Sequence, residues 1–207
     1  MREVSLFGED AGHEAVLKAL LARMAADYGV QIRVRSLSAT GGLSRVHYKF
    51  GIYLNDIAKG IVAVPDMIVV ATDGNCKGYT TRLQEIERVA EPHPNLGAIV
   101  VYAIPDPHIE RWLLADPGAF KAVLGRGCNL PQHKCQKAFY KELLAQEVQA
   151  AHVKPILGGL EYAEDIIGAM DLARVEMSES SFEKVLKELK GRFNQWKQQP
   201  SLPEPNP

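Results

Sequence analysis

Short apolar segments alternate with amphipathic helical segments over the first 103 residues, and this alternation restricts the fold more than any other feature. Four segments have the composition and periodicity of strands: residues 3–8, 30–37, 67–71 and 96–103. Three segments between them have apolar residues at helical spacing: residues 11–28, 44–59 and 80–90. Strands that alternate with helices favour parallel β–α units, so we expect an α/β fold with an open, mostly parallel sheet flanked by helices.

Beyond residue 103 the pattern changes to helical segments punctuated by proline, and we expect no further strand. The expected helices span residues 132–152, 162–174 and 182–198, the last preceded by a capping-box signature, Ser-Ser-Phe-Glu. We therefore expect three parts. These are an α/β domain of residues 1–125, a helical C-terminal extension of residues 126–198 packed on it, and a disordered, proline-rich tail of residues 199–207.

The composition is that of a soluble globular protein, with 46% hydrophobic and 24% charged residues. A formal net charge of -1 excludes a strongly basic chain, so a nucleic-acid site would have to be local. The three cysteines are odd in number and contain no C-x-x-C pair, which argues against an exported disulfide framework. With neither a signal-peptide pattern nor a membrane-spanning window, we expect a cytoplasmic protein with no membrane partner.

Three carboxylates follow the ends of predicted strands: Glu9, Asp73 and Glu110. Because the carboxyl ends of parallel strands meet at one edge of a sheet, these acids are expected to converge there. A hard divalent cation such as Mg²⁺ or Mn²⁺ relieves the repulsion among carboxylates, and it can activate water and stabilise a transferring phosphoryl group. A single acid at a strand end is more often a helix cap or a solvated turn, but three on one edge favour a site.

These residues resemble the Toprim domain, which is found in topoisomerases, bacterial primases and OLD-type nucleases. The similarity lies in a glutamate after the first strand, in LFGEDAGHE, and an Asp-x-Asp-like element after a later strand, in IVVATDGN. A closer similarity is to a family of small Toprim-like proteins that are often encoded beside an AAA or ABC-type ATPase in bacterial genomes. The landmarks of that family cover most of the chain: GEDAGHE around Glu9, Gly41-Gly42, ATDGNCKG around Asp73, IPDPHIERWLLAD at residues 104–116 and SFEKVLKEL at residues 181–189.

The resemblance implies a metal-dependent nuclease-like site, or a site descended from one. Carried over by position, Glu9 would be a metal ligand or general acid/base, and Asp73 the principal metal ligand. Asn75 stands where the motif has a second aspartate. An amide oxygen can ligate Mg²⁺ but brings no charge, so Glu110 or Asp116 would have to supply the missing carboxylate. We expect Glu110 to face the site and Asp116 to cap the next helix, which has a proline at its first position.

Several basic and glycine residues have candidate roles beside these acids. Lys77 as a catalytic residue, and Arg82, could neutralise a substrate phosphate or the transition state, although either could equally be a solvated helix charge. Gly41 and Gly42 could present backbone N–H groups to a phosphate, but an ordinary strand-to-helix turn is the commoner use of such a pair. Lys154 is a candidate phosphate contact through the resemblance alone.

Histidines, cysteines and basic clusters give weaker signals. His13 and His108 lie beside predicted site acids and could act as bases or ligands, but a hydrogen-bonded structural histidine is commoner. Basic and aromatic residues at 134–141 and 184–197 could contact nucleic acid, although their apolar members also suit helix packing. Three potential zinc ligands match no standard finger spacing: Cys128, His133 and Cys135.

The leading hypothesis is a divalent-metal-dependent, Toprim-like nuclease that acts on DNA or RNA in bacterial antiviral defence, with an AAA or ABC-type ATPase partner and as a homo-oligomer. The chain has no Walker A sequence, so ATP dependence would come from that partner. The second hypothesis is a catalytically inactive Toprim-like regulatory or interaction subunit of an ATPase complex. A third is a receiver-like domain with Glu9, Asp10 and Asp73 as a phosphoacceptor pocket, against which the C-terminal extension argues.

Overall fold

A four-stranded parallel sheet forms the centre of the molecule in the computed structural model, which describes residues 1–37 and 41–199. The strands are β1 (Arg2–Gly8), β2 (Ile32–Ser36), β3 (Met67–Ala71) and β4 (Val100–Ala103). Their order is β2-β1-β3-β4, and every neighbouring pair is parallel. All five residues of β3 are buried, as its continuous apolar sequence predicts for a strand covered on both faces. The expected α/β fold is confirmed.

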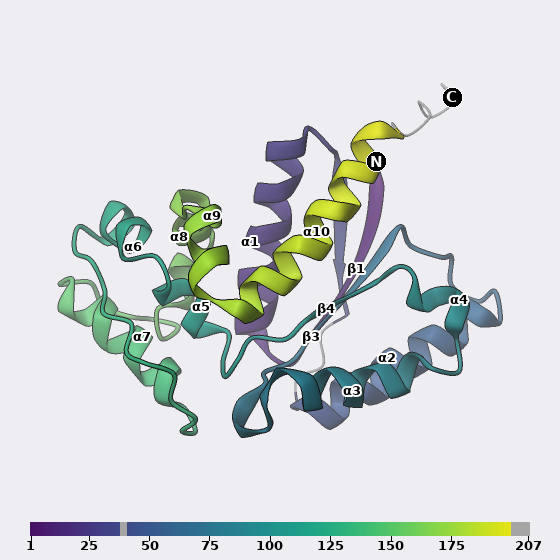
Figure 1. The fold of residues 1–207 in the computed structure, drawn as a ribbon, viewed down its shortest axis with the longest axis horizontal. Coiled ribbons are helices and arrows are strands. Elements are labelled where there is room, and N and C mark those ends of the chain that lie inside the picture. Colours follow the sequence, from purple (N-terminus) through teal and green to yellow (C-terminus); the bar gives the residue numbers. More distant parts are fainter. Residues whose placement is uncertain (38–40, 200–207) are drawn as a thin grey trace.

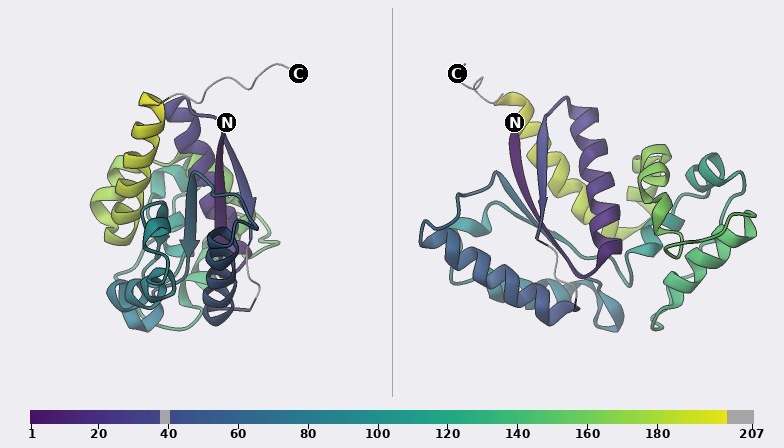
Figure 2. Two further views of the ribbon diagram at one scale, coloured as in Figure 1. Left: turned by 90° about the vertical axis from the view of Figure 1, so that its right-hand side faces the viewer. Right: turned by 180° about the vertical axis from the view of Figure 1, so that it is seen from behind.

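Helices cover both faces of this sheet (Figures 1 and 2). The helices α1 (Ala11–Tyr28) and α10 (Ser180–Gln198) lie on one face, and α2 (Leu43–Ala58) and α3 (Gly78–Ala90) lie on the other. Alternate side chains along each strand point to opposite faces, so β3 contributes Val69 to the cluster with α1 and α10 and Val70 to the cluster with α2 and α3. The sheet therefore separates two hydrophobic clusters.

Local sequence sets both ends of α1. The Asp10 carboxylate accepts hydrogen bonds from the backbone N–H groups of Gly12 and His13, which satisfies two donors that the first turn leaves unpaired. The helix ends at Gly29, whose φ of 65° is the left-handed conformation that glycine adopts at little cost. The N-terminus of α1 is thereby fixed directly after β1, at the carboxyl edge of the sheet.

Short helices make up the rest of the described chain, and no strand follows β4 within residues 1–37 and 41–199. They are η1 (Asn75–Lys77), α4 (Pro94–Gly97), α5 (Glu110–Leu114), α6 (Pro117–Leu124), α7 (Phe139–Ala150), η2 (Leu160–Tyr162), α8 (Ala163–Ala169) and α9 (Leu172–Ser178). Helices α5 to α9 gather at one end of the molecule, beyond α1 (Figure 1). Leu20 of α1, Leu144 of α7 and Ile166 of α8 belong to one hydrophobic cluster, so the C-terminal helices share a core with the sheet.

Several expected boundaries were wrong. The helix expected from residue 132 begins only at Phe139, after an irregular segment that ends with Ala138 at φ 61°. The helix expected at residues 162–174 is two helices, because Asp171 takes an extended conformation and its carboxylate accepts from the N–H of Arg174 to start α9. The last strand is shorter than expected because Pro94 begins the helical turn α4.

The expected capping box before α10 does not form. Glu179 occupies the cap position, and no side chain caps the helix there. The Ser181 hydroxyl instead accepts hydrogen bonds from the indole Nε1 of Trp112, at 2.9 Å, and from the backbone N–H of Asp106. The start of α10 is thus fastened to the turn after β4 and to α5.

None of the helices in the described ranges combines the length and apolar character that a bilayer crossing needs. The expected tail lies, apart from Gln199, outside the described residues.

Candidate functional site

The carboxyl ends of β1, β3 and β4 bring the three predicted acids together. Glu9 follows β1, Asp73 follows β3, and Glu110 is the first residue of α5 after β4. The Glu9 carboxylate accepts a hydrogen bond from the backbone N–H of Asp73, with 3.2 Å between nitrogen and Oε2. Burial, together with the nearby negative charge of Asp73, raises the pKa of Glu110 above its usual range. The three acids therefore meet at one edge of the sheet, with Glu110 electrostatically coupled to Asp73 and Glu9 hydrogen-bonded to the Asp73 backbone.

Two histidines contact Asp73. Its Oδ1 lies 3.0 Å from His13 Nε2 and accepts a hydrogen bond from the backbone N–H of Ile109 at 2.9 Å, while Oδ2 lies 3.3 Å from His108 Nδ1. The His13 contact is within ion-pair distance, but its angle is not that of a hydrogen bond. Burial alone would raise the pKa of Asp73, but the charge of His13 and the hydrogen bond from His108 hold this pKa below its usual range. Asp73 is therefore ionised and already paired.

His13 joins Asp73 to Asp10. The His13 side chain is 1% exposed, and its Nδ1 lies 2.9 Å from Asp10 Oδ1. Burial acts to lower the pKa of His13, but the charge of Asp73 and the hydrogen bond to Asp10 outweigh it and raise this pKa to about 10. The same contact with His13 holds the pKa of Asp10 far below its usual range. A buried imidazolium between two carboxylates is the result.

Lys141, on α7, is a cation close to the acids on the solvent side. Its Nζ lies 3.6 Å from Asp10 Oδ2 and 3.9 Å from Glu110 Oε1. The Glu110 side chain is 4% exposed and that of Lys141 is 55% exposed, so the ammonium group compensates the buried carboxylate only from the surface. Helix α7 therefore contributes to a site that otherwise comes from the strand ends.

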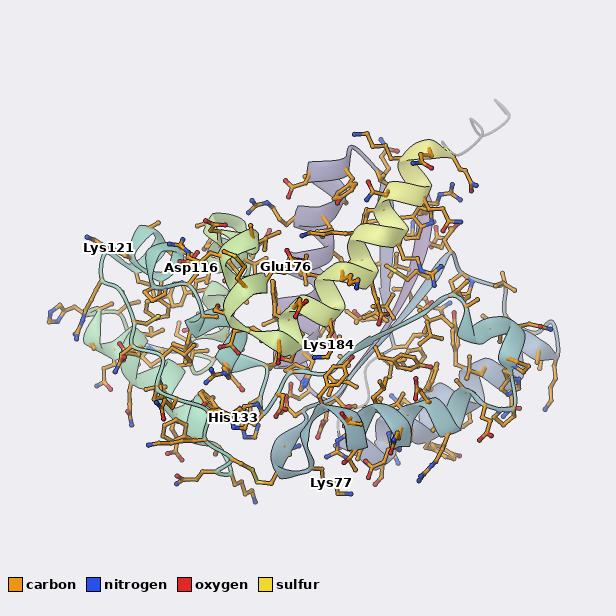
Figure 3. All side chains as sticks on the ribbon, viewed as in Figure 1. Lys77, Asp116, Lys121, His133, Glu176 and Lys184 are labelled. Atoms are coloured by element: carbon orange, nitrogen blue, oxygen red, sulfur yellow. A yellow bond between two sulfur atoms is a disulfide. The ribbon has the colours of Figure 1, made fainter. Side chains whose placement is uncertain are left out.

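The predicted basic residues do not reach the carboxylates of the cluster. Lys77 forms an ion pair with Glu85 at 2.8 Å and projects at the lower edge of the molecule in Figure 3. Arg82 is buried, and its guanidinium donates to the backbone carbonyl of Asp73 at 3.0 Å and to Glu85. Lys154 is exposed in the segment between α7 and η2. Arg82 therefore supports the turn that carries Asp73, and the catalytic role of Lys77 gains no contact that would support it.

Asn75 is used in the turn after β3. Its φ is 48°, its backbone N–H donates to the carbonyl of Pro107 at 2.9 Å, and its side-chain amide lies 3.4 Å from the carbonyl of Asp73. Asparagine tolerates this left-handed conformation better than most residues. The side-chain nitrogen thus points to the backbone of Asp73, in keeping with turn chemistry.

The glycine pair lies beside Glu9, at the start of α2. Gly41 and Gly42 have φ of 131° and 78°, which other residues rarely adopt. A Cβ atom on Gly42 would lie 3.8 Å from Glu9 Oε1, so this turn approaches the cluster closely. The pair was predicted as a phosphate contact or as an ordinary turn, and both uses agree with this position.

Asp116 is a structural residue, as expected from the proline that follows it. It is fully buried and caps α6 by accepting from the backbone N–H groups of Gly118 and Ala119. It also accepts from the N–H of Asp171 at 2.8 Å and contacts Arg174. Asp116 therefore does not supply the carboxylate that Asn75 lacks.

A disulfide, which the sequence did not predict, joins Cys76 to Cys135. His133 contacts Asp106 with 3.2 Å between Nε2 and Oδ1, and Cys128 is a free, half-buried thiol, so the three weak zinc candidates serve different purposes. In the part of the chain that the structure describes, no group of three or more His, Cys, Asp and Glu residues is arranged to hold a metal ion.

Four further residues of the cluster had only weak support from the sequence. His13 and His108 were weak candidates for bases or ligands, Asp10 belonged to the receiver-like alternative, and Lys141 belonged to a basic segment. His13 lies four residues after Glu9, which places it near the same edge of the sheet, but its contact with Asp73 depends on the packing of α1. His108 directly precedes the strand-end segment that contains Glu110, but nothing local indicates that it turns toward Asp73. Lys141 comes from a helix about 30 residues farther along the chain, and only the fold brings it here.

No protein-family model, curated protein or solved structure matches this chain.

Proposed function

We propose that this cluster binds a divalent cation, Mg²⁺ or Mn²⁺, and hydrolyses phosphodiester bonds in DNA or RNA, as a Toprim-like nuclease. The observation that carries the proposal is the convergence of Glu9, Asp73 and Glu110 at the carboxyl ends of three parallel strands. Ligand sites of open parallel sheets lie at this edge.

The residues fit one cation better than two. Mg²⁺ is usually held by one or two carboxylates, with waters and substrate phosphates completing its shell, so a cluster of three protein ligands is not required. Glu9 and Glu110 are the candidate ligands, since within residues 1–37 and 41–199 the buried Glu110 carboxylate has only an exposed ammonium group at 3.9 Å as an ion-pair partner. Asp73 is paired with two histidines, so it would ligate the cation only where a histidine contact is released, and Asn75 brings no charge. When bound, the cation would act as a Lewis acid for the phosphoryl group and lower the pKa of a bound water.

The chain's own residues would supply the remaining functions. Glu9 has one oxygen engaged by the N–H of Asp73, and its other oxygen faces the Gly42 turn, so it can accept a proton at Oε1. Lys141 can hold a substrate phosphate, because its ammonium group is more than half exposed beside Glu110. His108 and Ile109 fix the orientation of Asp73 from the other side. From the family resemblance, we further propose bacterial antiviral defence with an ATPase partner, and a homo-oligomer as the working form.

The test is a cleavage assay with single-stranded and duplex DNA and RNA in Mn²⁺, with and without a candidate AAA or ABC-type ATPase partner. We expect the variants Glu9→Gln, Asp73→Asn and Glu110→Gln each to lose at least about 100-fold in cleavage rate, the scale of removing a key electrostatic group. Glu164→Gln, an exposed acid on α8, is the matched control and should keep the native rate. Lys77→Met should lose little, because Lys77 pairs with Glu85. Absence of cleavage under all of these conditions would remove the enzymatic proposal.

A second candidate is a catalytically inactive Toprim-like subunit that regulates an ATPase complex. It is favoured by one observation: both oxygens of Asp73 are already contacted, by His13, His108 and the N–H of Ile109. Calorimetry with Mn²⁺ separates the two candidates. Binding to the native chain that is lost in Glu110→Gln supports the nuclease, whereas no binding to the native chain and none to Asn75→Asp supports the inactive subunit.

A further inference from the structure

The Cys76–Cys135 disulfide joins two segments of the candidate site that lie 59 residues apart in sequence. Cys76 lies in η1, three residues after Asp73, and Cys135 lies in the irregular segment before α7. Their Cα atoms are 5.2 Å apart, within the usual range for disulfides. Both residues are exposed, so dissolved thiols can reach the bond. Lys77 and His133, labelled in Figure 3, mark the two segments that the disulfide joins.

The segment that carries Cys135 also contacts the residues around Asp73. The backbone N–H of Lys134, the residue before Cys135, donates to the Tyr140 hydroxyl at 3.0 Å. The ring centroid of Tyr140 lies 6.1 Å from that of His108, whose Nδ1 lies 3.3 Å from Asp73 Oδ2. His133 contacts Asp106 in the same turn. The disulfide therefore anchors residues 131–138 to the Asp73 turn, and that segment in turn contacts Asp106 and Tyr140, the tyrosine whose ring lies near His108.

The third cysteine does not compete in thiol exchange. Cys128 is half-buried with its Sγ 3.4 Å from the carbonyl of Leu114, and burial raises the pKa of its thiol to about 12. The thiolate is the reactive species, so Cys128 is unreactive near neutral pH. Thiol exchange is therefore confined to Cys76 and Cys135, which form a disulfide and are exposed to solvent. In the cytoplasmic setting expected from the sequence, disulfides are usually transient, catalytic or redox-sensing.

We propose that Cys76–Cys135 is a redox modification site for small thiols of the glutathione class, and that its state sets how firmly residues 131–138 hold His108 on Asp73. In the exchange, one thiolate attacks a sulfur of the disulfide to form a mixed disulfide and release one cysteine. A second thiol then releases the other cysteine, so that two thiols become one small disulfide and the protein gains two thiol groups. The oxidised protein is the restrained form and the reduced protein is the open form.

The first measurement is alkylation of the unfolded protein after equilibration in glutathione redox buffers, followed by intact mass. The oxidised protein should present one alkylatable cysteine, Cys128, and the reduced protein three. Backbone hydrogen exchange at residues 131–138 should then be at least about fivefold faster in the reduced protein, since exchange reports local opening. In Cys135→Ser, hydrogen exchange at residues 131–138 should be fast in both oxidising and reducing buffer. The control Cys128→Ser should keep the difference in hydrogen exchange between the oxidised and reduced proteins.

Three alkylatable cysteines in the most oxidising buffer would overturn the proposal, and so would unchanged hydrogen exchange in protein whose reduction is confirmed by mass. The redox site at Cys76–Cys135 stands independently of the proposed nuclease activity. Its consequence for metal binding by the acid cluster rests on that proposed activity. If His108 is released from Asp73, Mn²⁺ should bind more tightly to the reduced protein in calorimetry. A redox difference in hydrogen exchange without Mn²⁺ binding in either state would support the redox site while removing the metal-dependent function.

Discussion

His13 balances the charges of the acid cluster at the scale of a single residue. Its imidazole is buried between Asp10 and Asp73, and its pKa is raised to about 10 in the folded chain, against about 6.5 for an unperturbed histidine. The folded state therefore keeps a proton that the unfolded state gives up as the pH rises. This contribution to stability is fully present below about pH 6.5 and is lost as the pH rises toward 10.

We expect the urea midpoint of the metal-free native protein to fall between pH 6.5 and 10, and His13→Gln to lose most of this fall. Urea unfolding followed by circular dichroism at several pH values, in the presence of a chelator, measures it. His152→Asn is the control, because His152 is exposed and has a φ of 60° that asparagine tolerates. An equal pH dependence in the native and His13→Gln proteins would show that His13 is not the group responsible.

Placement at strand ends was enough to predict that Glu9, Asp73 and Glu110 converge at one edge of the sheet. That prediction needs only the strand positions and a parallel sheet. The partners of Asp73 could not be predicted in this way. Whether His13 and His108 pair with a carboxylate depends on the packing of α1 and of the turn after β4, to which local sequence gives no access. The same limit applies to the Cys76–Cys135 bond, which closes between segments 59 residues apart.

At the scale of elements, a buried ion pair connects α5 to the start of α10. Arg111 Nε and Nη2 lie 2.8 and 2.7 Å from the two carboxylate oxygens of Glu179, and both side chains are largely buried. Arg111 also donates to the Tyr140 hydroxyl of α7 at 2.7 Å. One guanidinium group thus connects three helical elements next to the candidate site.

We expect Arg111→Met to lower the free energy of unfolding by about 3–5 kcal/mol, because it leaves the Glu179 carboxylate buried without its partner. The double variant Arg111→Met with Glu179→Leu should recover much of this loss. Lys18→Met, which removes an exposed pair with Glu14, should change stability by only about 0.5 kcal/mol. Chemical denaturation measures all three, and an additive double variant would contradict a coupled pair.

Periodicity predicted those elements whose apolar faces pack on the sheet. The bounds of α1 and β3 agree with the expected ones, because each has a continuous buried face and strong end signals. Periodicity did not predict the helix bounds between α7 and α9, where the helices are short and tertiary contacts determine their ends. Asp171 interrupts a continuous helical pattern there, because its backbone N–H binds the buried carboxylate of Asp116.

At the scale of the whole molecule, the C-terminal helices complete the core of the α/β domain. Leu17 and Leu20 of α1 belong to one cluster with Ile166 of α8 and with Phe182 and Phe193 of α10. The face of the sheet under α10 would lose its cover without that helix. The layers and the helical extension were predictable from the sequence. The extension was expected to pack on the α/β domain, but that α10 is the helix that covers the sheet was not predictable, because amphipathic helices do not specify their partner.

We expect residues 1–125 alone not to form a cooperatively folded unit, because removal of α10 exposes large apolar side chains of the sheet and α1. The shortened chain should lack a cooperative thermal transition in calorimetry and should aggregate. Residues 1–199 serve as the control and should unfold cooperatively. A stable, cooperative 1–125 fragment would show instead that the division into a domain and an extension is energetic as well as sequential.

Both tryptophans of the chain are in contact with α10 or belong to it. Trp112 is fully buried beside Phe182, with ring centroids 5.2 Å apart, and its Nε1 donates to Ser181. Trp196 packs against Phe193 within α10 itself. Indole emission shifts to longer wavelength when the ring meets water, so undocking of this last helix would appear as a red shift. Trp112 follows Glu110 by only two residues, and the chain therefore contains an optical reporter beside its acid cluster that needs no label.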